Sequence, residues 1–243
     1  MIVANVRHRL TRDDAQLAVR LIARGSAREH DAAEQALREA GLDTLLDDPR
    51  LLEGLVRTAA GAAASWPLFC YVVVRHALQS HGIDDRRMAD YVAAVLEAFG
   101  WRDRAHRIAA TDDERYDTLA DLVRDAESGD PRRAYLVRVH LGNYALWLAG
   151  CFPDRIEAQR HRRGGPDIDY YDALGARGFS MAAEHRLAHE QGLSPLFAAA
   201  ARRYVALRIA LNAVSDTLFF PNRHSPDRLL RQVRDEARWR LAS

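Results

Sequence analysis

Residues Tyr135 to Phe152 read YLVRVHLGNYALWLAGCF, and this stretch decides the fold class. Drawn as a helix, it is apolar on nearly all sides, and so is a second stretch from Trp66 to Leu78 (WPLFCYVVVRHAL). A helix that carries apolar side chains all round is buried among other helices. We therefore expect an all-α helical bundle with two buried central helices, at residues 66–80 and 131–150.

Capping signals divide the rest of the chain into further helices, about ten in all. Thr11 and Asp14, like Thr111 and Glu114, have the spacing at which two side chains bond the free N–H groups of a first turn. Asp130 precedes Pro131, which is tolerated at a first helical position because its missing N–H has no helical partner. The predicted helices cover residues 12–24, 27–40, 49–60, 66–80, 85–99, 113–127, 131–150, 154–163, 168–191, 195–220 and 226–241.

The domain organisation follows from a change in helix character. Short, charge-rich amphipathic helices occupy residues 1–64, and the main bundle occupies residues 65–243. We interpret the small residues from Gly61 to Ser65 as a subdomain boundary. A heptad seam also runs along the predicted helix 195–220, through Phe197, Ala200, Tyr204, Leu207, Leu211, Val214 and Leu218. We expect the 197–218 seam to pack inside the chain, with a homodimer as the alternative.

The composition excludes several kinds of chemistry. The chain has 243 residues and a net charge of +1, so charge alone does not imply a nucleic-acid or membrane partner. All 35 basic residues are arginine. Without lysine the chain cannot form a lysine Schiff base or use a P-loop lysine, and neither a GxxxxGK[ST] nor a GxGxxG motif occurs.

Two cysteines, Cys70 and Cys151, each lie in an apolar stretch. Their number and spacing predict neither a disulfide framework nor a zinc site. The N-terminus has no apolar signal-peptide region, and no apolar run is long enough to span a membrane. We expect a cytoplasmic protein with no membrane partner and no cofactor.

Polar residues on the two central helices are the first candidate site. Arg75 and His76 lie on one helix, and His140, Asn143 and Tyr144 lie on the other. The last three are spaced i, i+3 and i+4 and so share a helix face. Buried polar groups need partners, and facing groups of this kind would form a polar pocket inside the bundle. The alternative is a structural hydrogen-bond network.

A basic stretch with nearby tyrosines is the second candidate, a patch for nucleic acid or another anion. Its members are Arg155, Arg160, His161, Arg162, Arg163, Tyr170 and Tyr171. Arginine forks suit phosphate, and tyrosine rings stack on bases. Arg155 and His161 also have a spacing found in some all-α ribonucleases, but that spacing is as frequent here as chance predicts. A solvated helix end is the alternative interpretation.

His185 and His189 are weak candidates for a metal site. On one continuous helix over 168–191 their i, i+4 spacing places both rings on one face. Two histidines alone do not make a site, and we expect no bound metal. A solvated helix end that gains from the helix dipole is the simpler interpretation.

The densest unusual stretch is residues 140–179, which also holds four glycines within helical pattern, Gly142, Gly150, Gly175 and Gly178. We interpret these glycines as sites of close helix packing or of a close ligand. The leading functional hypothesis is a helical adaptor that binds protein partners through the 140–179 surface, without catalysis. One alternative is a nucleic-acid-binding or ribonuclease-like protein that uses Arg155 to Arg163. A second alternative is an enzyme or sensor with a small ligand or metal near His76 and His140.

Overall fold

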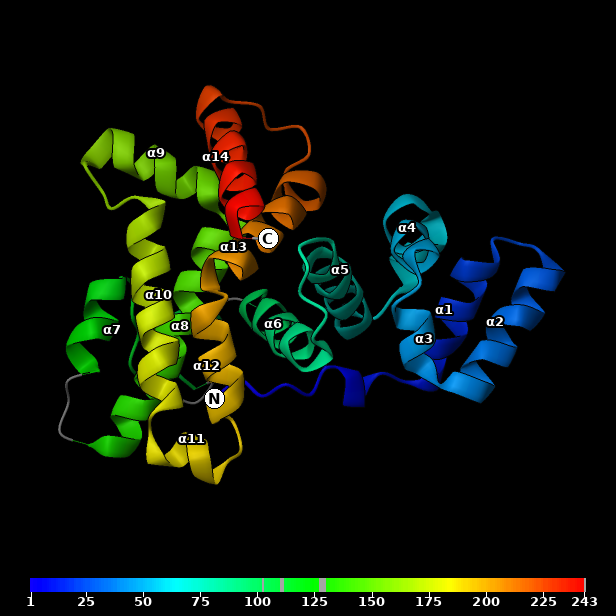
Figure 1. The fold of residues 1–243 in the computed structure, drawn as a ribbon, viewed down its shortest axis with the longest axis horizontal. Coiled ribbons are helices and arrows are strands. Elements are labelled where there is room, and N and C mark those ends of the chain that lie inside the picture. The colour runs from blue at the N-terminus through cyan, green and yellow to red at the C-terminus, as the bar shows by residue number, and fades with distance from the viewer. Residues whose placement is uncertain (102, 110–111, 127–129, 243) are drawn as a thin grey trace. The chain divides into compact units, whose positions relative to one another are not determined.

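The computed structural model describes residues 1–101, 103–109, 112–126 and 130–242 of the chain. Within these ranges every regular element is a helix and no strand occurs, which confirms the all-α prediction (Figure 1). None of the described helices is both long and apolar enough to cross a membrane. Contacts divide the chain into an N-terminal unit, Val3–Glu97, and a C-terminal unit, Met1–Ile2 with Ala98–Ser243. The subdomain boundary predicted at Gly61–Ser65 falls inside the N-terminal unit.

The N-terminal unit is built around α1, which packs against α2, α3 and α4. Thr11 begins α1 with the expected capping box, because its hydroxyl accepts from the Asp14 N–H and the Asp14 carboxylate accepts from the Thr11 N–H. The short helix α3 was not predicted, since only Gly41, at φ +80°, separates it from α2. The elements are η1 (Arg7–Arg9), α1 (Arg12–Ala23), α2 (Ala27–Ala40), α3 (Leu42–Leu46), α4 (Pro49–Arg57), η2 (Ala59–Ala63), α5 (Trp66–Ser80) and α6 (Arg86–Phe99).

The C-terminal unit is built around the predicted central helix α8, which packs against α7, α9, α10 and α13. Asp130 caps α8, as its carboxylate accepts from the Arg132 N–H at 3.0 Å. The elements are η3 (Arg104–His106), α7 (Leu119–Asp125), α8 (Pro131–Cys151), α9 (Pro153–Arg163), α10 (Ile168–Ala183), α11 (Arg186–Glu190), α12 (Ser194–Arg202), α13 (Tyr204–Val214), the π-helical turn η4 (Ser215–Phe219) and α14 (Pro226–Ala242).

Three predicted helices differ most from the structure. The helix expected at 113–127 begins at Leu119, where Thr118 caps it; Thr111 and Glu127 lie outside the described residues. The helix expected at 168–191 ends at Ala183 and is followed by the separate helix α11. The helix expected at 195–220 is interrupted at Arg203, whose φ of −103° and ψ of 15° leave the helical region.

The heptad seam is used inside the chain despite this interruption. The side chains of Phe197, Tyr204, Leu207 and Leu211 are buried, because α12 packs on α10 and α13 packs on α8 and α10. The seam residues therefore complete the core of the C-terminal unit.

The helical glycines permit very close approach between α8, α10 and α13. A Cβ atom added to Gly142 would lie 2.7 Å from the Phe179 ring, and one added to Gly150 would lie 2.7 Å from the Leu211 Cβ. A Cβ on Gly178 would lie 2.9 Å from the backbone nitrogen of Gly142, and a Cβ on Gly175 would overlap the Tyr204 hydroxyl. Of the two interpretations, close packing is therefore the one that explains these glycines.

Candidate functional site

The polar residues of the two central helices lie in different units, and each has local partners. In the N-terminal unit the Arg75 guanidinium is buried and paired with Asp47, at 2.7 Å, and with Asp84. The His76 Nε2 lies 3.0 Å from the Leu46 carbonyl oxygen. Burial lowers the pKa of His76, so the ring is neutral near pH 7. These contacts fit the structural-network interpretation of both residues.

His140 is a buried structural histidine in the C-terminal unit. Its Nε2 lies 2.9 Å from the Ala105 carbonyl oxygen, and its ring meets Phe99 edge-on at 5.5 Å. Burial, aided by nearby Arg104, lowers the pKa of His140 to about 3. The ring is therefore neutral and donates its Nε2 proton to Ala105. Asn143, one turn further along, is also buried.

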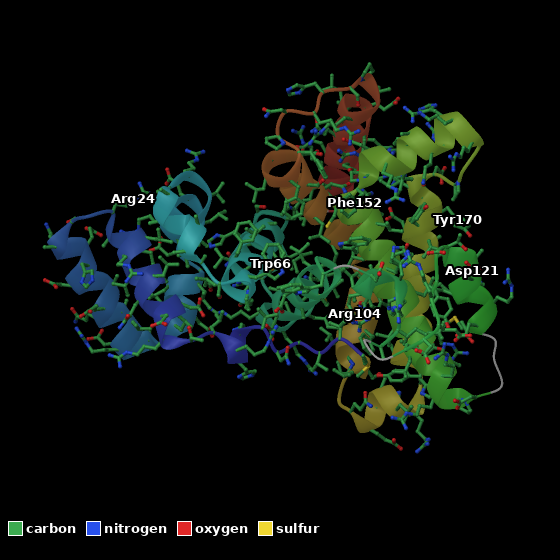
Figure 2. All side chains as sticks on the ribbon, turned by 180° about the vertical axis from the view of Figure 1, so that it is seen from behind. Arg24, Trp66, Arg104, Asp121, Phe152 and Tyr170 are labelled. Carbon is green, nitrogen blue, oxygen red and sulfur yellow. The ribbon has the colours of Figure 1, made fainter. Side chains whose placement is uncertain are left out.

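Tyr144 differs from its predicted companions because it lines a pocket between α7, α8, α9 and α10. The pocket has a volume of about 400 Å³, within the range of small-molecule sites. Figure 2 labels Phe152, at the junction of α8 and α9, and Tyr170, near the start of α10. The pocket is lined by Asp117, Thr118, Leu119, Ala120, Tyr144, Leu148, Phe152, Arg155, Ile156, Gln159, Pro166, Tyr170 and Tyr171.

Local sequence signals create this pocket. Pro153 ends the run of α8 and starts α9, and Gly164 ends α9 with a left-handed φ of +64°. Asp167 then caps α10, with its carboxylate accepting from the Tyr170 N–H at 3.0 Å. The cap fixes Tyr170 and Tyr171 in the first turn of α10, beside Arg155 in the first turn of α9.

The structure separates the predicted basic patch into members with different roles. Arg160 pairs with Glu157 at 3.0 Å, and His161 lies 3.4 Å from Asp227. Arg162 and Arg163 are exposed in the last turn of α9, where their positive charges interact favourably with the helix dipole. Of the basic members of the patch, Arg155 lines the pocket, together with Tyr170 and Tyr171. Within the described part of the chain its guanidinium has neither an ion pair nor a hydrogen bond.

The tyrosines supply rings and hydroxyl groups around Arg155. Tyr170 is 41% exposed, and its ring meets the Tyr171 ring edge-on at 6.0 Å. Burial raises the pKa of Tyr144 to about 12 and also raises the pKa of Tyr171. Both hydroxyls therefore stay protonated at neutral pH and can donate hydrogen bonds. Asp117, which also lines the pocket, is ionised, because a hydrogen bond from Arg115 lowers its pKa.

His185 and His189 do not lie on one continuous helix over 168–191. The α10 helix ends at Ala183, and His185 is the N-cap of α11, with φ −76° and ψ 140°. Its Nδ1 accepts from the Leu187 N–H at 3.2 Å, and its ring stacks on Tyr135 at 5.0 Å. The prediction that both histidines lie on one continuous helix is therefore wrong. Among the described residues no three His, Cys, Asp or Glu side chains are placed to hold a metal ion.

A buried ion-pair network under α14 was not anticipated. Arg208 is fully buried; its Nη2 lies 3.2 Å from Asp172 and its Nη1 lies 2.7 Å from Asp235. Although burial opposes the charge, these two carboxylates raise the pKa of Arg208. Its neighbour Asn212 donates to the carbonyls of Ala149 and Gly150. These carbonyls lie in the last turn of α8, where helical N–H partners are missing.

Because of the same network, α14 buries charged side chains and exposes apolar ones. Arg228, Arg231 and Asp235 are buried against the unit. Leu229, Leu230 and Val233, on the other side of the helix, are 61%, 70% and 69% exposed. A hydrophobic pattern alone places the apolar side inward, so only the ion pairs explain the observed orientation.

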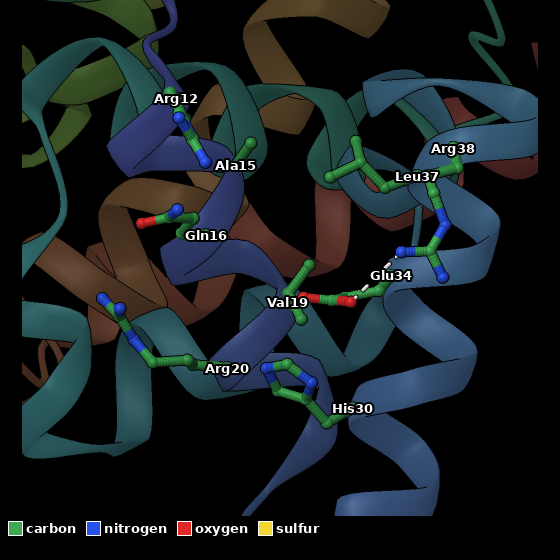
Figure 3. A pocket seen from close by; sticks show the side chains of 9 residues that line it. All are labelled: Arg12, Ala15, Gln16, Val19, Arg20, His30, Glu34, Leu37 and Arg38. Carbon is green, nitrogen blue, oxygen red and sulfur yellow. Dashed lines mark hydrogen bonds and ion pairs between the residues drawn. The ribbon is translucent and has the colours of Figure 1, made fainter.

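A second hollow, which sequence patterns did not indicate, lies between α1 and α2 in the N-terminal unit (Figure 3). It has a volume of about 370 Å³. Its lining residues are Arg12, Ala15, Gln16, Val19, Arg20, His30, Glu34, Leu37 and Arg38. We call it the α1–α2 groove.

Comparisons of the chain with protein families, curated proteins and solved structures give no match. Function must therefore be inferred from the geometry of the sites.

Proposed function

We propose that the chain is a cytoplasmic binding protein whose α7–α10 pocket takes a nucleotide, either free or as part of a single strand. The observation that carries this proposal is the unpaired Arg155 guanidinium, which lines a pocket of about 400 Å³ together with three tyrosines. An arginine fork is suited to a phosphate group, which it contacts through two parallel hydrogen bonds.

The other lining groups match the remaining parts of a nucleotide. The exposed Tyr170 ring offers a stacking face for a base, worth about 1–3 kcal/mol per base in single-strand binders. The ionised Asp117 can accept from ribose hydroxyls or from a base amino group, and the Gln159 amide can donate to or accept from a base edge. The described lining holds no histidine, cysteine or serine, and the Thr118 hydroxyl in it donates to the Asp121 carboxylate at 2.7 Å instead of to a base aimed into the pocket, so binding fits the lining better than nucleophilic catalysis.

Arg162 extends the proposed site beyond the pocket. It lies seven residues after Arg155 on α9, and Gln159 lies between them at i+4, so all three residues share one helix stripe. A phosphate next to the bound nucleotide would meet Arg162, which favours a strand over an isolated nucleotide. An adaptor function for the 140–179 surface remains a prediction, and no contact in the pocket favours a protein ligand over a nucleotide.

Fluorescence anisotropy of the full-length protein with a labelled ten-nucleotide RNA, with AMP as competitor, tests this proposal. We expect binding that weakens steeply with salt and an affinity that falls at least about tenfold in Arg155→Gln. Arg132→Gln is the matched control, because Arg132 is exposed in the first turn of α8, far along that helix from the pocket. No binding of either probe, or equal losses in the two variants, would overturn the proposal.

A further inference from the structure

We propose that the α1–α2 groove docks a short acidic amphipathic helix from a protein partner. This surface is in the N-terminal unit and shares no residue with the α7–α10 pocket. The inference is therefore independent of nucleotide binding.

The groove has an apolar floor between two polar walls. Val19 is buried, Ala15 and Leu37 are half-buried, and these three side chains form the floor. Figure 3 shows Val19 and Glu34 pointing toward each other, and Arg12, Gln16 and Arg20 along α1. Recognition of an amphipathic helix uses such an arrangement, in which apolar anchors enter a groove between helices.

Positive charge is placed at both ends of the groove. The helices run antiparallel in Figure 3, so Arg12 and Arg38 lie toward one end and Arg20 and His30 toward the other. In the described part of the chain, Arg12, Arg20 and His30 have no ion pair or side-chain hydrogen bond. Arg38 pairs with Glu34 at 3.2 Å, which is the one carboxylate in the lining. The groove therefore has an uncompensated positive charge at each end.

The distance between these charges defines the ligand. Arg12 and Arg20 are eight residues apart on one helix, a rise of about 12 Å. A partner helix that carries Asp or Glu at positions i and i+8 presents carboxylates at the same separation. Leu or Ile at i+4, on the same face, then meets Val19 and Leu37.

The charge of the whole unit favours a peptide over a nucleic acid. Residues Val3–Glu97 carry 12 Arg and 14 Asp or Glu residues. A long phosphate chain would extend past the groove and be repelled by this acidic surface, whereas a short helix can pair its two carboxylates inside the groove.

Three peptides of about 15 residues, each built on an alanine-rich helix and labelled with fluorescein, test the inference by anisotropy with the full-length protein. The first has Glu at i and i+8 and Leu at i+4. The second replaces both Glu with Lys, and the third replaces Leu with Ser. We expect the first peptide to bind at least about tenfold more tightly than either of the others.

Protein variants locate the binding. The double variant Arg12→Glu and Arg20→Glu should weaken the first peptide at least about tenfold. Arg28→Glu, an exposed charge reversal on α2 outside the groove, should change its affinity less than about twofold. The inference is overturned if the Ser peptide binds as tightly as the Leu peptide, or if the two protein variants lose affinity equally. Tighter binding of a ten-nucleotide RNA that the double variant abolishes would also overturn it and would make this groove a nucleic-acid site.

Discussion

Two regions of the C-terminal unit use the same residue types in opposite ways. Under α14, Arg208 is fully buried between Asp172 and Asp235, next to the buried Tyr204. In the α7–α10 pocket, Arg155 is exposed in the same lining as Asp117 and Tyr171, and its guanidinium has no partner among the described residues. The difference shows that pairing and burial, rather than residue type, separate an arginine that supports the fold from one that can bind a ligand.

The largest expected effect comes from replacing Arg208, the buried arginine of this comparison. Arg208→Leu removes the cation that pairs with the buried carboxylates of Asp172 and Asp235, although Asp235 keeps Arg231 at 3.7 Å, and breaking a buried pair in this way typically costs about 3–5 kcal/mol of unfolding free energy. Thermal and urea unfolding followed by circular dichroism measure this loss. Arg202→Leu, at the exposed end of α12, is the control and should change stability by less than about 0.5 kcal/mol. Similar losses in both variants would contradict the structural role of Arg208.

The packing around Tyr204 gives the next effect. Gly175→Ala forces a methyl group onto the Tyr204 hydroxyl, and overpacking of this kind costs about 1–3 kcal/mol. Tyr204→Phe removes a buried hydroxyl that has no hydrogen-bond partner among the described residues, so it should leave stability unchanged or raise it slightly. A double-mutant cycle then has a clear sign, because Gly175→Ala should cost less in the Tyr204→Phe background. Strictly additive losses would show that the hydroxyl and the added methyl group do not meet.

His140 extends the comparison to a buried base that has no carboxylate partner among the residues that the structure describes. Its pKa of about 3 in the folded state is below its ordinary value of 6.5, so the unfolded chain binds one more proton between these pH values. The resulting stability is complete above pH 6.5 and is lost as the pH falls toward 3. Between pH 7 and pH 5 the wild type should lose about 2 kcal/mol more than His140→Gln does. If the urea midpoints of the wild type and of His140→Gln change equally with pH, then His140 is protonated in the folded protein at pH 5, and the prediction is wrong.

The smallest effect on stability is expected from a change at Arg155, the exposed arginine of the comparison. Arg155→Gln should change the unfolding free energy by less than about 0.5 kcal/mol, because its guanidinium is exposed and unpaired. The same variant should lose most of its nucleotide affinity. A stability loss as large as that of Arg208→Leu would remove the distinction between the two arginines.

Much of the fold could be predicted from local signals. Thr11 and Asp130 each cap a helix at the expected place, and the apolar stretch that ends at Phe152 is the central helix α8. Capping signals fail where a helix is interrupted without proline or glycine. The break at Arg203 and the change of direction after Ala183 arise from packing between α10, α11 and α12, which leaves no local pattern.

The site was predictable in part, for a similar reason. Sequence patterns indicate all four of Arg155, Tyr144, Tyr170 and Tyr171, but they place Tyr144 in one candidate site and the other three in another. The turns at Pro153 and Gly164 bring them into one pocket. The orientation of α14 could not be predicted, because its buried arginines pair with a residue as distant along the chain as Asp154, and its buried Asp235 pairs with Arg208 of α13. The α1–α2 groove gave no signal, since scattered arginines on a helix resemble any solvated face.

The close contacts of Gly142, Gly150, Gly175 and Gly178 restrict how this sequence can change. Glycine and alanine codons differ at a single base, and alanine is abundant elsewhere in the helices. Alanine is therefore an accessible mutation at each of the four positions, and at each of them it fails sterically. The spacing between α8, α10 and α13 is in this way maintained by selection against the smallest side chain, and homologous chains should keep these glycines fixed even where their exposed alanines vary.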